Sequence, residues 1–389
     1  MPAVVVEGTL NALGVVRSLS HGRMPIYLLD SRPRCAARWS RHCCYIRVPA
    51  LEGRELADAL VALGRQLGCR PVLILTGDHS VDCVSEYREQ IAPLYRISLP
   101  SREMVRDLAD KARFQQLAER EGFAVPRAVT AESGADLARL DDLTPPLVVK
   151  PSDKRLVLEG TVERAVQAAT LADAHRAASQ MLKRARSVVV QEWIDGADTE
   201  LYFVLFSCDG EGRPLGLFAG RKLICSPPSV GSTAVSVAAG QAVAHELAAL
   251  TLQFIERTRY RGLGSLEFKR DASRHRFFII EPTVGRTDWQ EELATFCGVN
   301  LPLRTYLAEL GQPCAPVSES LPRVAWRQSA GYAAPLARGT HIVDGFFRWS
   351  DPLPGLQYYL LQAGVLRVWN KLCKTADHLA GSAAHRTKA

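Results

Sequence analysis

The chain has 389 residues, of which 47% are hydrophobic and 23% are charged, and it carries a formal net charge of +7. These values are ordinary for a globular protein, and the length predicts two or three domains. No uninterrupted apolar run reaches the roughly 18 residues of a transmembrane helix, and the N-terminus does not resemble a signal peptide. We therefore expect a cytoplasmic protein without stable membrane insertion, whose ten cysteines are reduced thiols.

The first hundred residues alternate between expected strands and helices. Strands are predicted at 4–6, 25–30, 45–48 and 71–76, and helices at about 8–19 and 52–67. This alternation is typical of a parallel sheet covered by helices on both faces, so residues 1–100 are expected to form a Rossmann-like domain. The spacing from Gly8 to Gly14 does not match G-x-G-x-x-G, which makes a dinucleotide-dependent oxidoreductase the less favoured alternative.

The middle of the chain contains longer strands. We expect a helix at 101–121 with Ser101 as its N-cap, a strand at 146–151, a helix reaching about 186, and a strand at 187–194. Strands at 201–207 and 215–223 follow, then a helix at 241–259 and strands at 264–270 and 275–281. The C-terminal segment contains apolar residues at helical spacing from 360 to 369. This helix is expected to pack on the body of the protein or on a second subunit, as in a homodimer, with a membrane-surface helix as the alternative.

Two glutamates occupy matching positions in the last pair of strands. If the hairpin centres on Arg274, Glu267 lies opposite Glu281. The residues expected to fill the other face are Leu266, Phe268, Phe278 and Ile280. Two opposed carboxylates repel unless a cation or a proton lies between them, and Mg²⁺ commonly takes one or two carboxylates. Two glutamates on a solvated strand face remain the alternative interpretation.

Two lysines precede this hairpin. Lys150 ends an apolar strand and is followed by a proline, and Lys111 lies in an expected helix. A lysine at the end of a buried strand extends its ammonium to solvent or binds an anion such as phosphate. Either interpretation fits Lys150, and Lys111 fits a surface charge equally well.

Four features therefore follow one another: a helix lysine, a strand-end lysine before proline, an apolar strand ending Gln-Glu-Trp-Ile-Asp-Gly, and two strand glutamates separated by a turn. This ordered set resembles the ATP-grasp superfamily, and more narrowly the carboxylate–amine ligase branch that includes D-aspartate ligase-like proteins. The resemblance covers roughly residues 1–310. It implies an α/β fold with a Rossmann-like pre-ATP-grasp domain (1–100), a two-lobed α+β ATP-grasp domain (101–310, lid about 125–195) and a C-terminal helical extension (311–389).

The resemblance also implies ligands and residue roles. The cofactors would be ATP and Mg²⁺, with Mn²⁺ as an alternative metal. Lys111 and Lys150 would contact the ATP phosphates, and Glu267 and Glu281 would hold the metal. The hinge strand against adenine would comprise Gln191, Glu192, Trp193 and Ile194, and either Asp198 or Glu200 would bind the ribose hydroxyls.

Two positions depart from the family pattern. Thr283 stands where a metal-binding asparagine is usual, and Arg286 is displaced by one residue. The loop at 152–160 is not rich in glycine and serine as in many relatives, so Lys154 and Arg155 would cover the phosphates by charge instead. These departures leave open a nucleotide-binding homologue without ligase turnover.

The activity implied is ATP-dependent ligation, in which a carboxylate is activated as an acyl phosphate and joined to an amine, often an amino acid. Arg221, Lys222 and Arg286 are candidates to anchor the anionic substrate and intermediate, although Arg221 and Lys222 also fit a solvated strand end. An arginine cluster between 32 and 41 has little aromatic interleaving, which disfavours nucleic acid. The expected partners are therefore small-molecule carboxylate and amine substrates.

Overall fold

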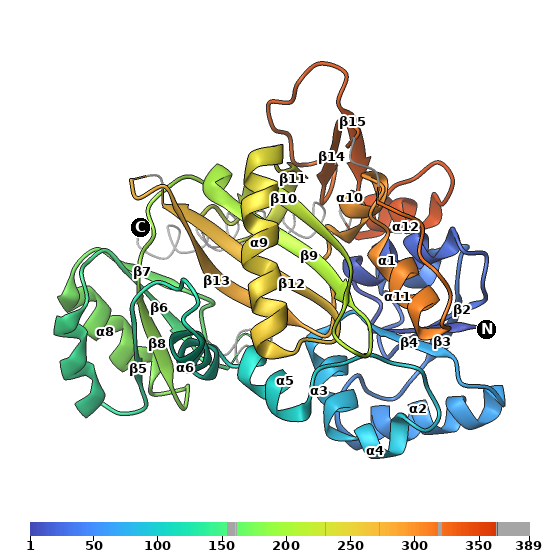
Figure 1. Ribbon diagram of the computed structural model, residues 1–389, viewed down its shortest axis with the longest axis horizontal. Coiled ribbons are helices and arrows are strands. Elements are labelled where there is room, and N and C mark those ends of the chain that lie inside the picture. Colours follow the sequence, from blue (N-terminus) through green and yellow to red (C-terminus); the bar gives the residue numbers. More distant parts are fainter. Residues whose placement is uncertain are drawn as a thin grey trace, which may run out of the picture.

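The computed structural model describes residues 1–153, 160, 162–229, 231–271, 273–317, 321–362 and 364. Lys154 and Arg155, predicted to cover the phosphates, lie outside the described residues, as does most of the apolar C-terminal segment. The described chain forms three sheets, which lie side by side in Figure 1 with the longest one in the centre.

The N-terminal sheet is parallel and has the strand order β3-β2-β1-β4. Its strands are β1 (Ala3–Val6), β2 (Ile26–Asp30), β3 (Cys44–Arg47) and β4 (Val72–Leu75). The helices around it are α1 (Leu10–Ser20), the 3₁₀ turn η1 (Ala36–Trp39), α2 (Gly53–Leu67), α3 (Asp78–Glu86) and α4 (Arg88–Ile91). Val5 packs in the same cluster as α1, whereas Val4 packs with α2 and α3. Because both faces are covered, β1 is apolar at every position, which confirms the predicted α/β arrangement.

The helix predicted at 101–121 is two helices, α5 (Arg102–Ala109) and α6 (Lys111–Glu121). Asp110 has extended backbone angles, and its carboxylate accepts hydrogen bonds from the N–H groups of Ala112 and Arg113. Asp110 is therefore an N-cap rather than a helix residue. Ser101 is confirmed as the N-cap of α5. The break makes Lys111 the first residue of a new helix.

A small antiparallel sheet follows, with the strand order β5-β8-β6-β7. It consists of β5 (Ala128–Ala131), β6 (Leu147–Pro151), β7 (Val166–Ala168) and β8 (Val188–Glu192). The 3₁₀ segment η2 (Ala135–Asp142) and helix α8 (Leu171–Met181) pack on it and share its separate hydrophobic core. The predicted helix reaching 186 was too long, since α8 ends at Met181.

The central sheet has seven strands in the order β13-β12-β9-β10-β11-β14-β15. Its strands are β9 (Leu201–Cys208), β10 (Pro214–Ser226), β11 (Ser232–Ala238), β12 (Gly262–Asp271), β13 (Arg276–Val284), β14 (Val324–Arg327) and β15 (His341–Asp344). The surrounding elements are the turn η3 (Asp198–Glu200), α9 (Gln241–Thr258), α10 (Glu291–Phe296), α11 (Leu301–Glu309), α12 (Leu353–Leu356) and the π-helical turn η4 (Gln357–Gln362). The described C-terminal extension is thus not only helical, because β14 and β15 add to the sheet.

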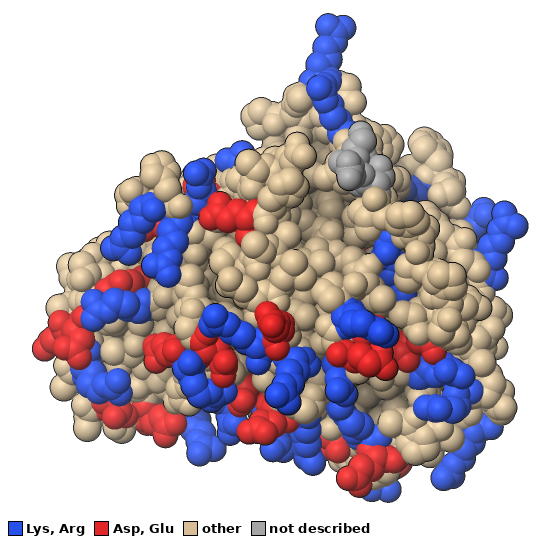
Figure 2. All heavy atoms as spheres, in the orientation of Figure 1, with Lys and Arg blue, Asp and Glu red and all other residues tan. Residues whose placement is uncertain are grey.

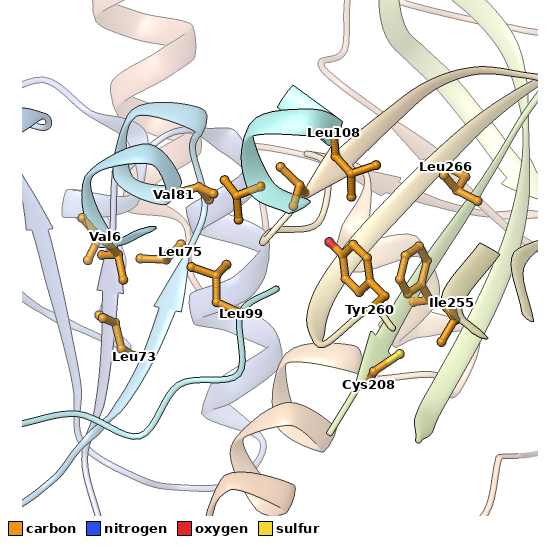
Figure 3. Close-up of a cluster of buried hydrophobic side chains, with 14 of the residues drawn as sticks. Val6, Leu73, Leu75, Val81, Leu99, Leu108, Cys208, Ile255, Tyr260 and Leu266 are labelled. Carbon is orange, nitrogen blue, oxygen red and sulfur yellow. The ribbon is translucent and has the colours of Figure 1, made fainter. Parts of the chain in front are cut away.

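A continuous core joins the N-terminal sheet to the central sheet. Leu73 and Leu75 from β4 and Leu99 from the connecting segment belong to the same buried cluster as Tyr260 and Leu266 near and on β12 (Figure 3). The hydroxyl of Tyr260 also accepts a hydrogen bond from the N–H of Gly285, just after β13. This packing fixes the carboxyl ends of β1 and β4 against the hairpin that carries the two glutamates.

The surface gives two further observations. Over the face seen in Figure 2, positive and negative side chains are intermingled, so the net charge does not form one basic patch there. Among the described residues, no helix has the length and apolarity needed to cross a lipid bilayer.

Candidate active site

The predicted pairing of Glu267 with Glu281 is confirmed by the register of β12 and β13. The next residue, Phe268, pairs with Ile279, so a bulge leaves Ile280 without a partner in the ladder. Because of the bulge, the β13 side chains between Phe277 and Ile280 alternate between the two faces of the sheet with a shift of one residue. Phe277 and Ile279 join the core with Phe268, and Ile280 lines a cavity. The prediction that Phe278 and Ile280 share the core face with Leu266 and Phe268 was therefore wrong. Strand β13 also continues past Glu281 to Val284.

Cationic side chains surround this carboxylate pair. The Lys222 ammonium, which is 3% exposed, donates a hydrogen bond to the Glu267 carboxylate. Lys111 and Arg164 each place a side-chain nitrogen 4.0 Å from a carboxylate oxygen of Glu281. The repulsion expected between the glutamates is therefore offset by cations of the protein itself.

Two lysines of the site have perturbed pKa values. Burial opposes the charge of Lys222, but the Glu267 carboxylate, together with Cys225 and Asp288, outweighs this effect and raises the pKa of Lys222. For Lys150 burial prevails and lowers the pKa, although Glu281 and Glu267 act in the opposite direction. The Lys150 ammonium donates to the Gln191 amide oxygen at 3.3 Å. Lys150 is thus a desolvated cation next to two carboxylates, a position in which a further anion would favour its charged form.

A small cavity of about 80 Å³ lies between the small sheet and the central sheet. It is lined by apolar groups from both sheets, by Lys150 and Lys269, and by the predicted hinge residues Gln191, Glu192, Trp193 and Ile194. The Trp193 N–H already donates to the Pro146 carbonyl at 2.9 Å. The Glu192 carboxylate accepts from the Thr144 N–H at 3.1 Å. Both contacts hold the chain that leaves β8.

A larger cavity of about 420 Å³ lies where the carboxyl ends of β1 and β4 meet the glutamate hairpin. It shares Lys111, Arg164, Glu267 and Glu281 with the small cavity. The two cavities therefore meet at the carboxylate pair. Lys222 and Thr283 also line the larger cavity, as do Glu7, Asp78, Arg286 and Asp288.

Other predicted residues are not brought to these cavities. Arg221 and Lys222 are neighbours on β10 and point in opposite directions. The Arg221 guanidinium donates to the Thr199 carbonyl at 2.6 Å and lies 3.5 Å from Glu200. The Asp198 carboxylate accepts from the N–H groups of Cys225 and Ser229, each at 2.8 Å. Asp198 thus holds the end of β10 and Ser229 in the loop after it, whereas Arg221 and Glu200 join β10 to the turn η3. None of the three lines either cavity as described.

The two positions that depart from the family pattern both contact Asp288. The Thr283 hydroxyl is 3.3 Å from an Asp288 carboxylate oxygen, and the Arg286 guanidinium is 3.2 Å from the same oxygen. Arg286 also donates to Asp78 at 2.7 Å. The guanidinium of Arg286 is therefore neutralised by two carboxylates.

The site also contains residues that sequence reasoning missed, among them Glu7, Asp78, Asp288, Arg164 and Lys269. Glu7 and Asp78 follow the carboxyl ends of parallel strands, where open α/β sheets bind ligands, so their positions offered a usable signal. Arg164 lies in an irregular segment, and nothing in its local sequence marks it.

The carboxylate pair fits a hard divalent cation. Among the described residues, no group of three or more acidic, histidine or cysteine side chains could by itself hold a metal. Mg²⁺ usually takes one or two carboxylates and completes its octahedron with water and phosphate oxygens. Glu267 and Glu281 face a common cavity in which a phosphate could supply the remaining ligands.

Comparisons with known proteins give structural matches only. No family model and no curated protein matches the sequence. N5-carboxyaminoimidazole synthetase from Staphylococcus aureus superposes with a TM-score of 0.62 at 14% identity, covering 82% of this chain and 78% of that one. Biotin carboxylase from Campylobacter jejuni, in a β,γ-ATP complex, gives a TM-score of 0.65 at 14% identity, over 82% and 73%.

A third match comes from Hydrogenobacter thermophilus. The biotin carboxylase domain dimer of its 2-oxoglutarate carboxylase, in complex with MgADP and bicarbonate, gives a TM-score of 0.62 at 14% identity, over 82% of this chain and 72% of that one. At this identity the agreement concerns the fold. Together with the order of sheets and the paired glutamates, it confirms the architecture expected from the sequence. The chain has the ATP-grasp fold.

Proposed function

We propose that this protein is an ATP-dependent ligase that activates a carboxylate as an acyl phosphate and joins it to an amine. The observation that carries the proposal is the meeting of two cavities at Glu267 and Glu281, with Lys111, Lys222 and Arg164 around them. One cavity suits a nucleotide base and the other suits the reacting groups. The nucleotide complexes named for the C. jejuni and H. thermophilus proteins support the same assignment.

In this proposal the adenine occupies the small cavity against the strand that ends at Glu192. The triphosphate extends from there toward Lys150 and Lys111. Glu267 and Glu281 would hold Mg²⁺, and the Thr283 hydroxyl lines the same cavity. The metal would neutralise charge on the phosphates when bound, and Mn²⁺ offers the same oxygen-ligand chemistry.

The reaction takes place where the cavities meet. A substrate carboxylate oxygen attacks the γ-phosphorus, the bond to the β-phosphate oxygen breaks, and ADP leaves. The nitrogen of the neutral amine then attacks the carbonyl carbon of the acyl phosphate and a C–N bond forms. Phosphate leaves with the electrons of the C–O bond and accepts the proton that the nitrogen loses. Lys222 stabilises the charge that develops on the transferring group, since its ammonium is buried and fixed.

The remaining predicted residues take supporting roles. Asp198 holds the loop after β10 through Cys225 and Ser229, and Glu200 and Arg221 hold the turn η3 against β10. Arg286 orders the wall of the larger cavity through Asp78 and Asp288 rather than anchoring an anion. A homodimer is consistent with the dimer named for the H. thermophilus domain.

A nucleotide-binding homologue without turnover is the second candidate. It is favoured by Thr283, whose hydroxyl interacts with Asp288 and is a weaker metal ligand than an amide oxygen. The two candidates differ in one measurable respect, because both bind nucleotide but only a ligase consumes it when both substrates are present.

The test combines binding and turnover. Calorimetry with a non-hydrolysable ATP analogue and Mg²⁺ is expected to give a Kd between micromolar and millimolar. ADP release is then measured against a panel of carboxylates and amines, singly and in pairs. Release that requires one carboxylate and one amine supports the ligase. Binding without release in any pair supports the second candidate, and absence of binding contradicts both.

A further inference from the structure

The inner end of the larger cavity, formed where β1 and β4 end, differs chemically from the end at the glutamate hairpin. It is lined by the carboxylates of Glu7, Asp78 and Asp288 and by the guanidinium of Arg286. Arg286 is shared between the two aspartates. The inner end therefore has more acidic than basic side chains, whereas the outer end has Lys111, Lys222 and Arg164 against Glu267 and Glu281.

Glu7 is held in this wall by an unusual backbone. Its φ angle is +80°, a left-handed value that costs a non-glycine residue free energy, and its side chain lies directly after β1. The residue is 6% exposed. Its carboxylate is so close to the end of β4 that a Cβ on Gly77 would lie 1.8 Å from it. Gly77 is thus required by the close approach of this carboxylate.

The Glu7 carboxylate has few partners of its own. Among the described residues, the Ser80 N–H donates a hydrogen bond to this carboxylate, and the distance of 3.4 Å is long for such a bond. Burial raises the pKa of Glu7, with His79 and Arg32 acting in the opposite direction. A strained, buried carboxylate that lines a cavity and is weakly satisfied by the protein is suited to accept hydrogen bonds from a ligand.

We propose that the inner end of the larger cavity binds the amine substrate as its ammonium ion, with Glu7 as the hydrogen-bond acceptor. The inference rests on the proposed ligase activity only in calling the amine a substrate. The cation site itself is formed by residues that follow β1, β4 and β13. A primary or secondary amine fits, because an N–H donor with positive charge complements both the geometry and the local excess of carboxylates. An ammonium held there faces the carboxylate pair, where the acyl phosphate forms, and it passes one proton to the Glu7 carboxylate before its nitrogen attacks.

The experiment measures amine binding to the full chain without nucleotide. The probes are the L-amino acids, ethanolamine and putrescine, each at about 10 mM, well above typical KM values. The N-acetylated form of each serves as its uncharged partner. We expect at least one amine to raise the wild-type Tm while its acetylated form does not. In Glu7→Gln the Kd of that amine is expected to rise at least tenfold.

A matched variant controls for the substitution itself. Glu52→Gln makes the same change at an exposed glutamate that pairs with His79 outside the cavity, and it is expected to bind the amine as the wild type does. If Glu7→Gln does not fold, Asp288→Asn is the second variant, with the same expected loss. The proposal is wrong if no amine in the panel binds, if acetylation has no effect, or if the variant that folds binds as tightly as the wild type.

The same preparation separates this inference from the proposed function. Glu7→Gln should leave the affinity for the Mg²⁺-bound ATP analogue within about twofold, because Glu7 lies away from the small cavity. Loss of amine binding together with normal analogue binding supports the site. Normal amine binding in a wild type that does not bind the analogue would refute the ligase and retain the cation site.

Discussion

The surroundings of Glu291, at the start of α10, predict how the free energy of unfolding depends on pH. Its side chain is fully buried and contacts α1, where the Ser18 hydroxyl donates to it at 3.0 Å. The Thr295 hydroxyl donates to it at 2.8 Å. Burial raises the pKa of Glu291 from 4.5 to about 8, with the neighbouring Glu292 adding to the effect. At neutral pH this carboxyl is therefore largely protonated in the folded protein.

The sign and size of the pH dependence follow from this shift. Because the folded state binds the proton more tightly than the unfolded state, the stabilisation is fully present below about pH 4.5 and is lost as the pH rises toward 8. Each pH unit in that window costs about 1.4 kcal/mol. Between pH 5.5 and 7.5 the wild type should lose on the order of 3 kcal/mol through this group.

Glu291→Gln removes the titration while keeping an amide that can still contact Ser18 and Thr295. We expect the variant to match the wild type below about pH 4.5, and to lose less stability than the wild type between pH 5.5 and pH 7.5, by on the order of 3 kcal/mol. Urea denaturation at both pH values measures the free energies of unfolding. Glu246→Gln, at an exposed position on α9, is the control and should show no such difference. An equal pH dependence in wild type and Glu291→Gln would refute a raised pKa at this position.

Two further predictions concern the nucleotide site. Lys150→Ala should raise the Kd of the Mg²⁺-bound ATP analogue at least tenfold, as measured by calorimetry, because the lysine is desolvated and its pKa is lowered. The urea midpoint should change little. An unchanged Kd would show that Lys150 does not bind the nucleotide. Glu281→Gln should reduce ADP release at least a hundredfold, because the proposed metal ligand is lost. It should also lower the metal-free stability by up to about 1 kcal/mol, because the ion pairs of Glu281 with Lys111 and Arg164 are lost. Near-wild-type turnover in Glu281→Gln would exclude it as a ligand.

The local features of the site could be predicted from the sequence when they depended on strand or helix geometry alone. Glu267 and Glu281 face each other because an antiparallel hairpin with a short turn fixes which residues pair. The bulge at Ile280 could not be foreseen, since it depends on how β13 packs against the core, and it shifted the predicted inner face. Similarly, alternation shows that only one of Arg221 and Lys222 can face the cavity, but not which one.

The inner end of the larger cavity depends on contacts between distant parts of the chain. Glu7 and Asp78 reach the glutamate hairpin only because the cluster around Leu99 and Tyr260 joins the N-terminal sheet to the central sheet. No periodicity in the sequence encodes that docking. The break at Asp110 is a smaller example, because the apolar pattern continues across it and only the capping side chain marks the new helix.

The charges of the site are arranged for two ligands of opposite sign. The cations at the outer end and in the small cavity are Lys111, Lys150, Lys222, Lys269 and Arg164, and the carboxylates are Glu192, Glu267 and Glu281. This leaves an excess of two positive charges when all are ionised. A complex of ATP with one Mg²⁺ carries about two negative charges, so its arrival would balance this excess. The phosphates would favour the charged form of Lys150, because burial lowers its pKa and the nearby carboxylates do not compensate for that effect. The acidic inner end has the opposite imbalance, and a bound ammonium would offset it. In the proposed reaction each ligand fits only one end, which would keep the amine and the phosphates apart until the acyl phosphate forms at the carboxylate pair between them.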